Sequence, residues 1–280
     1  MIRVYSQSKP SRILLLWHKL WLHLRQRLIK NFEVIDGDSR FRLRCETPRE
    51  VGRCIKFFVK EPGTCEWIRN EVIPGETFYD IGANIGVFTL LAAERTGGQG
   101  KVFAFEPHSG TFMRLLDNIA MNNLQHIVVA CNFALNDKDG FFPFNYSSSE
   151  AGTSDSQLSS VIGFSGVEYQ PEISELKYAA SIDSLIGSGE FAAPHHIKID
   201  VDGNELTILH GMSKLLIGPE KPRTIQVEIN KRSESDIMSF MEAHNYTLTD
   251  KHFTRSVSRR IERGGDPEKY HYNAIFRRGA

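Results

Sequence analysis

The chain has 280 residues, a formal net charge of zero and 41% hydrophobic residues. This length accommodates one large core, or one core with an appendage, and the balanced charge gives no global field of the kind that indicates nucleic-acid binding. The four cysteines have no Cys-x-x-Cys spacing, which predicts free, packed thiols in a reducing compartment rather than a disulfide framework or a zinc site. The sequence has no uninterrupted apolar run of about 18 residues, so no single helix is predicted to cross a bilayer.

The first 30 residues are predicted to form a basic amphipathic helix, because seven Lys and Arg and no acid precede Glu33. Apolar residues recur there at steps of three and four: Ile13, Leu16, Trp17, Leu20, Trp21, Leu24 and Leu28. This stripe either packs on the rest of the protein or a partner chain, or makes peripheral contact with an anionic membrane through residues 11–30. The interrupting His and Lys residues argue against a cleavable secretory signal. We therefore expect a cytoplasmic protein, with association at the membrane periphery as the alternative.

Residues 31–64 are predicted to form a small β-rich lead-in, with strands at 41–45 and 54–59, and residues 65–280 a single α/β domain. The expected helices of the domain are at 66–72, 85–96, 109–122, from about 204, and 234–244. The expected strands are at 77–82, 102–106, 127–133, 196–201 and 223–229, with last strands near 246–249 and 270–276. Strands and helices that alternate in this way predict a parallel sheet.

Between residues 136 and 180 the alternation is interrupted. We expect a turn at 136–140, an edge strand at 141–146 and an irregular segment at 147–160 that is rich in Ser, Gly and Thr. An insertion of this length inside a compact domain is usually functional or mobile. We interpret it as a wall of the acceptor site or a lid, with an ordinary solvated loop as the alternative.

The most informative segment is Thr77–Ala92, in which the turn Gly82-Ala-Asn84-Ile-Gly86 joins an apolar strand to an apolar helix. The next apolar run ends in a lone acid, Glu106. Glycine allows the backbone to approach a ligand closely, and an acid at the end of the second strand can accept hydrogen bonds from both hydroxyls of a ribose. The pattern predicts a nucleoside site in an α/β sheet.

A dinucleotide site needs Gly-x-Gly-x-x-Gly, because the pyrophosphate packs on bare backbone at a helix N-terminus. Here Asn84 replaces the middle glycine, and Asp80 precedes the turn. A carboxylate there attracts a cationic amine and repels a pyrophosphate, which favours S-adenosylmethionine over a nicotinamide dinucleotide. The predicted cofactor-binding residues are Asp80, Gly82, Asn84, Gly86 and Glu106. A purely structural turn with incidental glycines is the alternative.

The fourth predicted strand carries charge where a central parallel strand is normally apolar on both faces. Side chains alternate along a strand, so Lys198, Asp200 and Asp202 are expected to share one face. Burying such charges is costly unless they pair, which indicates either a working site or an ion pair that only braces the sheet. Methyl transfer to an alcohol requires removal of a proton. We expect Asp200 first and Glu205 second in this role, with Lys198 as a further catalytic residue.

Six segments resemble, in this order, the FkbM family of S-adenosylmethionine-dependent methyltransferases: Phe78-Tyr-Asp-Ile-Gly-Ala-Asn-Ile-Gly86, Phe105-Glu-Pro107, Met121-Asn-Asn-Leu124, Ser181-Ile-Asp-Ser-Leu185, Ile197-Lys-Ile-Asp-Val-Asp-Gly-Asn-Glu205 and Ile225-Gln-Val-Glu-Ile229. The resemblance covers roughly residues 65–278. It implies a class I, Rossmann-like fold: a seven-stranded, mostly parallel sheet with an antiparallel last strand and helices on both faces. It also implies O-methylation of a hydroxyl on a sugar, glycolipid, polyketide or similar metabolite. Asp202 stands where the family usually has Glu, which keeps the charge and shortens its reach.

Two assignments and several alternatives stay open. Asp137 is predicted to reach the adenine, unless it only forms an Asx turn. Asp200, Glu228 and Asn230 could converge as oxygen ligands for Mg²⁺, but no spacing requires this and no metal is predicted. A protein or nucleic-acid methyltransferase would be expected to show an Asn-Pro-Pro-Tyr-type motif or a basic, aromatic groove, and the sequence has neither. A non-catalytic cofactor-binding module, or an enzyme with a protein or lipid acceptor, is the alternative.

Overall fold

The computed structural model describes residues 16, 17, 20, 30–36, 39–56, 58–163 and 166–279. The predicted N-terminal helix lies outside these ranges except for Leu16, Trp17 and Leu20, whose side chains are exposed. Within the described ranges, each helix is too short or too polar to span a membrane.

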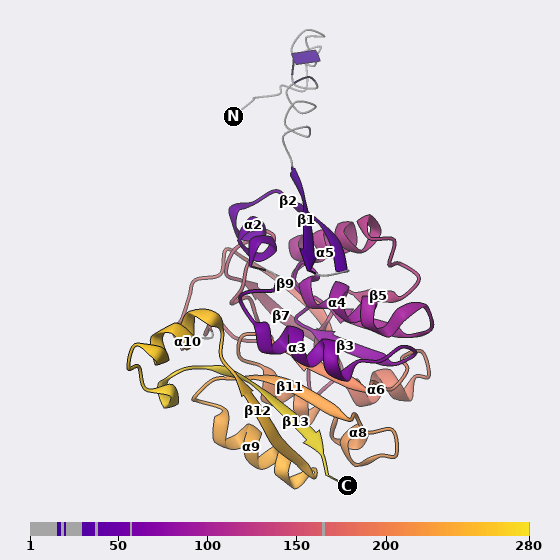
Figure 1. The fold of residues 1–280 in the computed structure, drawn as a ribbon, viewed down its shortest axis with the longest axis vertical. Helices are drawn as coiled ribbons and strands as arrows, with labels where there is room; N and C mark the ends of the chain where they lie inside the picture. The colour runs from indigo at the N-terminus through magenta and orange to yellow at the C-terminus, as the bar shows by residue number, and fades with distance from the viewer. Residues whose placement is uncertain are drawn as a thin grey trace.

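A seven-stranded sheet forms the centre of the molecule, in the order β12-β13-β11-β10-β3-β4-β5 (Figure 1). Its five neighbouring parallel strands are β3 (Thr77–Ile81), β4 (Lys101–Phe105), β5 (Val128–Cys131), β10 (His196–Ile199) and β11 (Thr224–Ile229). The last strand, β13 (Tyr272–Arg278), runs antiparallel to both β11 and β12 (Tyr246–His252). The predicted sheet, mostly parallel with an antiparallel last strand, is therefore confirmed.

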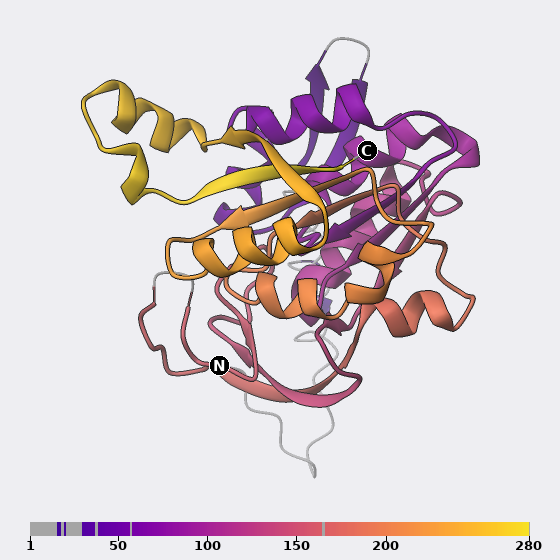
Figure 2. The ribbon, with the colours of Figure 1, turned by 90° about the horizontal axis from the view of Figure 1, so that it is seen from below.

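Helices cover both faces of this sheet, as predicted. One apolar cluster joins the sheet to α3 (Pro62–Glu71), α4 (Val87–Thr96) and α5 (Ser109–Met121). A second cluster on the other face joins it to α6 (Ile182–Gly187), α7 (Glu205–His210), α8 (Ser213–Ile217) and α9 (Glu234–Ala243). Figure 2 shows the purple and the orange helices on opposite sides of the sheet. Outside these layers lie α10 (Arg255–Glu262) and two short 3-10 turns, Gly97–Gln99 and Pro267–Lys269.

The parallel strands end together at one edge of the sheet, where ligands of open α/β sheets bind. All residues of β3 are buried, because helices pack on both of its faces. After β4 the chain turns at this edge into α5, whose first turn is capped by His108: its Nδ1 accepts a hydrogen bond from the Thr111 N–H. His196 begins β10 at the opposite edge, and its ring contacts the carboxylate of Glu76.

The lead-in differs from its predicted structure. A strand was expected at residues 54–59, but this prediction is wrong, because α2 (Pro48–Ile55) follows the hairpin of β1 (Lys30–Asp36) and β2 (Ser39–Cys45). Thr47 and Glu50 form a capping box, in which each side chain accepts a hydrogen bond from the backbone N–H of the other. The lead-in shares the core of α3 and α4, to which it contributes Phe41, Leu43, Cys45 and Cys54. All four cysteines are buried and free, as predicted.

The insertion forms a separate four-stranded sheet in the order β6-β9-β7-β8. Its strands are β6 (Ala134–Leu135), β7 (Gly140–Tyr146), β8 (Gln157–Leu158) and β9 (Ile173–Ala180). The strand predicted at 141–146 exists as β7, but it has a neighbour on each side and is not an edge strand. The Ser-rich residues 147–156 connect β7 to β8 and are called the lid segment below.

Candidate functional site

Three adjoining cavities surround the glycine turn at the carboxyl edge of the sheet, and Gly82 lines all of them. The first, the charged cavity, lies between the lead-in and the acids that follow β10 and end β11. The second, the Glu106 cavity, shares Asn84 and Ser154 with the first. The third, the apolar cavity, is lined chiefly by Phe105, Phe133, Leu135, Phe144 and Ile208.

The turn between β3 and α4 adopts the conformation that its glycines predict. Gly82, Asn84 and Gly86 have φ angles of 79°, 51° and 94°, which glycine adopts freely and asparagine tolerates. A β-carbon on Gly82 would lie 1.8 Å from the carbonyl oxygen of Asp200. Glycine is therefore required at position 82 because the turn packs against the backbone that follows β10, in addition to any need for space around a ligand.

Glu106 follows β4 and faces the cavity that bears its name. Its Oε2 accepts a hydrogen bond from the Asn84 N–H at 2.8 Å, and its Oε1 accepts one from the His108 N–H at 2.9 Å. A carboxylate oxygen has two lone pairs, so each oxygen can still accept a bond from a hydroxyl group. Burial raises the pKa of Glu106 to about 7, although the two N–H donors oppose this rise.

The apolar cavity has no charged residue among the described residues that line it, and it has the lining expected for an adenine ring. Asp137, which is predicted to reach the adenine, lies elsewhere. It is exposed in the turn after β6 and lines none of the three cavities. Its Cα packs close to Gly211, just after α7. The structure does not bring Asp137 together with the other predicted cofactor residues.

Asp80 lies beneath the turn and not on a cavity surface. Its Oδ2 accepts a hydrogen bond from the Thr89 hydroxyl at 2.6 Å, and its Oδ1 lies 3.5 Å from the Lys198 ammonium. The same ammonium lies 3.2 Å from Oδ2 of Asp200. Burial opposes the charged form of Lys198, but Asp200 and Asp80 outweigh burial and raise its pKa. Lys198 therefore stays charged and links the acid before the glycine turn to the acid after β10.

Asp200, Asp202 and Glu228 form an acid cluster on the charged cavity, in which one carboxylate oxygen of each residue lies within 4.8 Å of the corresponding oxygens of the other two. β10 ends at Ile199, so the first two acids belong to a turn, in which Asp202 has a φ of 62°. The expected alternation of Lys198, Asp200 and Asp202 along one strand is therefore wrong beyond residue 199. The turn nevertheless brings all three to the same cavity.

The carboxyls of the acid cluster differ in acidity. Burial opposes the ionisation of Asp200, but the charges of Lys198 and Lys60 outweigh it and hold the pKa of Asp200 below its usual range. Burial and the charge of Asp200 raise the pKa of Asp202 to about 6 and raise that of Glu228 well above its ordinary value. Asp200 and Glu228 interact directly, and each shifts the pKa of the other, so they titrate as a pair.

Asn230 does not join this cluster. Its Oδ1 accepts hydrogen bonds from the backbone N–H groups of Arg232 and Ser233 before α9. The ligand set considered for Mg²⁺, in which Asn230 accompanies Asp200 and Glu228, is therefore not assembled. Carboxyls also come this close when they share a proton, so the acid cluster by itself does not assign a metal.

Glu205, the second predicted base, lines none of the three cavities. It is fully buried, and its Oε1 accepts hydrogen bonds from the N–H groups of Gly203 at 3.0 Å and Val201 at 3.4 Å. Its Oε2 has no hydrogen-bond partner in the described part of the chain. This geometry favours a positioning role, in which Glu205 holds the turn that carries Asp200 and Asp202.

Glu205→Gln is expected to make the stability of the protein less sensitive to pH. Burial raises the pKa of Glu205 from 4.5 to about 7. Between these values the folded state holds an extra proton, so the wild type loses stability as the pH rises towards and through 7, whereas glutamine does not titrate. Denaturant unfolding measures the free energy of unfolding of both proteins at about pH 5.5 and about pH 8. The value of the variant relative to that of the wild type should increase between these pH values by on the order of 1–3 kcal/mol. An equal difference at both pH values would contradict the pKa shift.

The lid segment crosses the site and connects its two sides. The Asp155 N–H donates a hydrogen bond to the carboxylate of Asp202 at 2.9 Å. On the other side, the Arg53 guanidinium of α2 donates to the carbonyl of Gly152 and to the hydroxyl of Ser154, each at 2.9 Å. The segment thus has the position of a lid between the acid cluster and the lead-in, as one of its two interpretations predicts.

The cationic side of the charged cavity was not predicted from the sequence. Arg53, Lys56 and Lys60 come from α2 and the turn that follows it. The capping-box pattern Thr47-x-x-Glu50 is the signal from which α2 could have been predicted. No local pattern indicates that this helix faces the glycine turn.

Comparison with known proteins agrees with this geometry. A family model described as the methyltransferase FkbM domain matches residues 80–248, more than half of the chain. The hexuronic acid methyltransferase AglP of Haloferax volcanii is 27% identical over 199 residues, which are 70% of this chain and 74% of that protein. The crystal structure of a methyltransferase FkbM from Methylobacillus flagellatus KT has a TM-score of 0.50 and 15% identity, a likeness of fold that covers 94% of this chain and 60% of that chain.

The residues of the site fit S-adenosylmethionine. Glu106 keeps lone pairs for the ribose hydroxyls, and the apolar cavity beside it has the lining for the adenine. The acid cluster complements a sulfonium and an ammonium, and it would repel the pyrophosphate of a dinucleotide. The chain therefore belongs to the FkbM family of methyltransferases, with S-adenosylmethionine as its cofactor.

Proposed function

We propose that the protein transfers the methyl group of S-adenosylmethionine to a hydroxyl oxygen of a sugar or a similar metabolite. The observation that carries this proposal is the acid cluster of Asp200, Asp202 and Glu228, next to the Glu106 cavity. A module that only binds the cofactor has a use for negative charge that faces its sulfonium and ammonium, but it does not need a carboxyl that can take up a proton. A methyltransferase that acts on an alcohol does, because the alcohol oxygen becomes a strong nucleophile only as its proton leaves.

The bound cofactor supplies an electrophilic methyl group, and the chain has to align the acceptor and remove its proton. Asp200, which Lys198 keeps ionised from 3.2 Å, accepts the hydrogen bond of the acceptor hydroxyl. The positive groups of the cofactor favour the ionised form of Glu228, and conversion of the sulfonium to a thioether removes part of this effect, so the pair of Asp200 and Glu228 then takes up the acceptor proton. The lid segment excludes water from this step.

A saccharide acceptor is supported by the similarity to a protein that is named a hexuronic acid methyltransferase. The carboxylates of the acid cluster can accept hydrogen bonds from an acceptor that is rich in hydroxyl groups. A lipid-linked glycan would also give the predicted basic helix at residues 11–30 a function at a membrane surface.

The purified chain, incubated with S-adenosylmethionine and paired neutral and acidic saccharides, tests the proposal. Release of S-adenosylhomocysteine and a methylated product seen by mass spectrometry are expected only when an acceptor is present. A product that resists alkali is a methyl ether and supports transfer to a hydroxyl. A product that alkali hydrolyses is an ester and would move the acceptor atom to a carboxylate. Cofactor binding without transfer to any saccharide would favour the non-catalytic module.

A further inference from the structure

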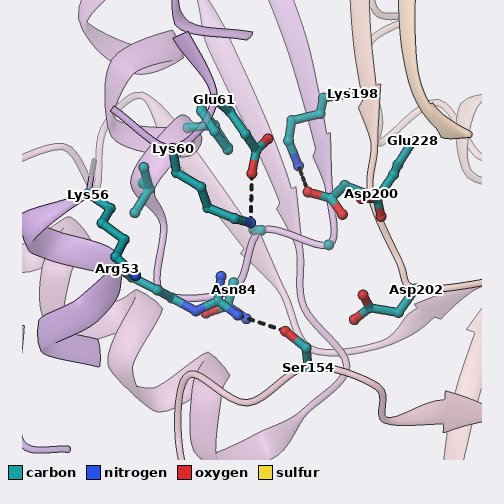
Figure 3. A pocket seen from close by; sticks show the side chains of 14 residues that line it. Arg53, Lys56, Lys60, Glu61, Asn84, Ser154, Lys198, Asp200, Asp202 and Glu228 are labelled. Atoms are coloured by element: carbon teal, nitrogen blue, oxygen red, sulfur yellow. Dashed lines mark hydrogen bonds and ion pairs between the residues drawn. The ribbon is translucent and has the colours of Figure 1, made fainter. Parts of the chain in front are cut away.

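The charged cavity has walls of opposite charge. Figure 3 shows the side chains of Arg53 and Lys56 on one side and the carboxylates of Asp200, Asp202 and Glu228 on the other. The first wall comes from α2 and its C-terminal cap, and the second from the turn after β10 and from β11. A ligand that fills the space between these walls is best matched when it carries groups of both signs.

The cationic wall is not neutralised by the protein itself. Lys60, which also lines the cavity, has its ammonium 2.8 Å from the Glu61 carboxylate. Arg53 donates to two neutral oxygens of the lid segment, and Lys56 is exposed. In the described part of the chain, neither Arg53 nor Lys56 has a carboxylate within ion-pair distance. Two positive charges therefore face the cavity without an anion.

The acid wall is neutralised only in part. Lys198 pairs with Asp200 at 3.2 Å. Across the described ranges, no Lys or Arg lies within ion-pair distance of Asp202 or Glu228. This wall can therefore take a cationic group, just as the opposite wall can take an anionic one.

The charged cavity begins where the nucleoside site ends. Asn84 and Ser154 line both it and the Glu106 cavity. A ligand whose ribose is held by Glu106 therefore extends past these two residues into the space between the charged walls. Beyond its ribose, S-adenosylmethionine carries a sulfonium, an ammonium and a carboxylate, which are two positive groups and one negative group.

We propose that Arg53 and Lys56 bind the carboxylate of the methionine tail of S-adenosylmethionine, while the acid wall faces its sulfonium and ammonium. Both residues precede the segment 80–248 that matches the family model. The lead-in of this chain thus completes the cofactor site. The assignment rests on the cofactor of the proposed reaction, and it is independent of which acceptor is used.

Calorimetric titration of the whole chain with two probes isolates this contact. S-adenosylhomocysteine carries the amino acid tail, and 5′-methylthioadenosine has a methyl group in its place but the same nucleoside. Lys56→Gln is expected to weaken binding of S-adenosylhomocysteine about tenfold or more, the scale of one charge-assisted hydrogen bond, and to change binding of methylthioadenosine less than about twofold. Lys101→Gln, at the exposed start of β4, is the matched control and should change neither affinity.

Arg53→Gln is expected to weaken both probes, because Arg53 also holds the lid segment, with the larger loss for S-adenosylhomocysteine. Equal losses of the two probes in Lys56→Gln would assign the effect to folding or to the lid. An unchanged affinity for S-adenosylhomocysteine would mean that the cations face the acceptor. Either result overturns the assignment. Failure of the wild type to bind either probe would instead contradict the cofactor site as a whole.

Discussion

Asp200→Asn is expected to lower kcat at least about 100-fold, the usual scale for loss of a general base, and to weaken the binding of S-adenosylmethionine by less than about tenfold, because Asp202 and Glu228 still face its positive groups. Asparagine has nearly the same volume, but it cannot take up a proton and it leaves the buried Lys198 with Asp80 alone, at 3.5 Å. The chemical step should therefore fail while the nucleoside site stays intact. Single-turnover rates at saturating cofactor, with Kd from calorimetry, separate the two effects.

Glu228→Gln is the companion variant, because the charge of Asp200 contributes to the raised pKa of Glu228 and the two carboxyls titrate as a pair. If the two carboxyls act as a unit, the double variant should lose little more activity than the less active of the two single variants. Thermal unfolding checks that the lost Lys198 ion pair has not unfolded the protein. Wild-type turnover in Asp200→Asn would exclude it as the base. If the product made by this variant is also hydrolysed by alkali, the acceptor is a carboxylate, which has no proton for a base to remove.

Glu106→Gln is expected to weaken binding of S-adenosylhomocysteine by about 10- to 100-fold. Glutamine retains one acceptor oxygen, which cannot serve both ribose hydroxyls and the N–H groups of Asn84 and His108 that now bond to the carboxylate. Because the ribose is common to both probes, methylthioadenosine should lose as much affinity as S-adenosylhomocysteine. This equal loss distinguishes Glu106 from Lys56, for which only the probe with the tail is affected.

The pH dependence of binding provides a second test of Glu106. Burial raises the pKa of Glu106 to about 7, and hydroxyl donors favour the ionised carboxylate. Binding of methylthioadenosine, which lacks the charged tail, should therefore release a proton, so the affinity of the wild type for this probe should rise between about pH 6 and about pH 8, and that of Glu106→Gln should not. If Glu106→Gln bound both probes as tightly as the wild type at every pH, Glu106 would only support the turn.

Local patterns were sufficient to predict the central sheet. The order of β3, α4, β4 and α5 follows from apolar runs broken by turns, and each element depends mainly on its own residues. The strand expected at residues 54–59 failed because this apolar run spans the end of α2 and the turn after it, and the capping box at Thr47 outweighs it. The second sheet could not be predicted as such, because β7 pairs with β9 through contacts between residues as distant in the chain as Gly140 and Ala179.

For the site, the sequence predicted which acids gather at the strand ends but not where each side chain points. Asp200 and Glu205 are only five positions apart in the sequence, but the backbone turns at Asp202, which has a positive φ. The side chain of Glu205 therefore binds the backbone of this turn and does not lie beside Asp200 on the cavity. The cations of the charged cavity could not be predicted, because their position depends on how the lead-in packs on the domain.

The close packing at Gly82 couples the shape of the cofactor site to the position of the acid cluster. A β-carbon at position 82 would lie only 1.8 Å from the carbonyl oxygen of Asp200, which is too close for both atoms to fit. Any substitution made there to reshape the cofactor pocket displaces the acid cluster first, so an engineer would see lost turnover before altered cofactor preference. Efforts to change the specificity of this enzyme should therefore keep the glycine turn and the end of β10 unchanged. Substitutions should instead be made in the lead-in and the lid segment.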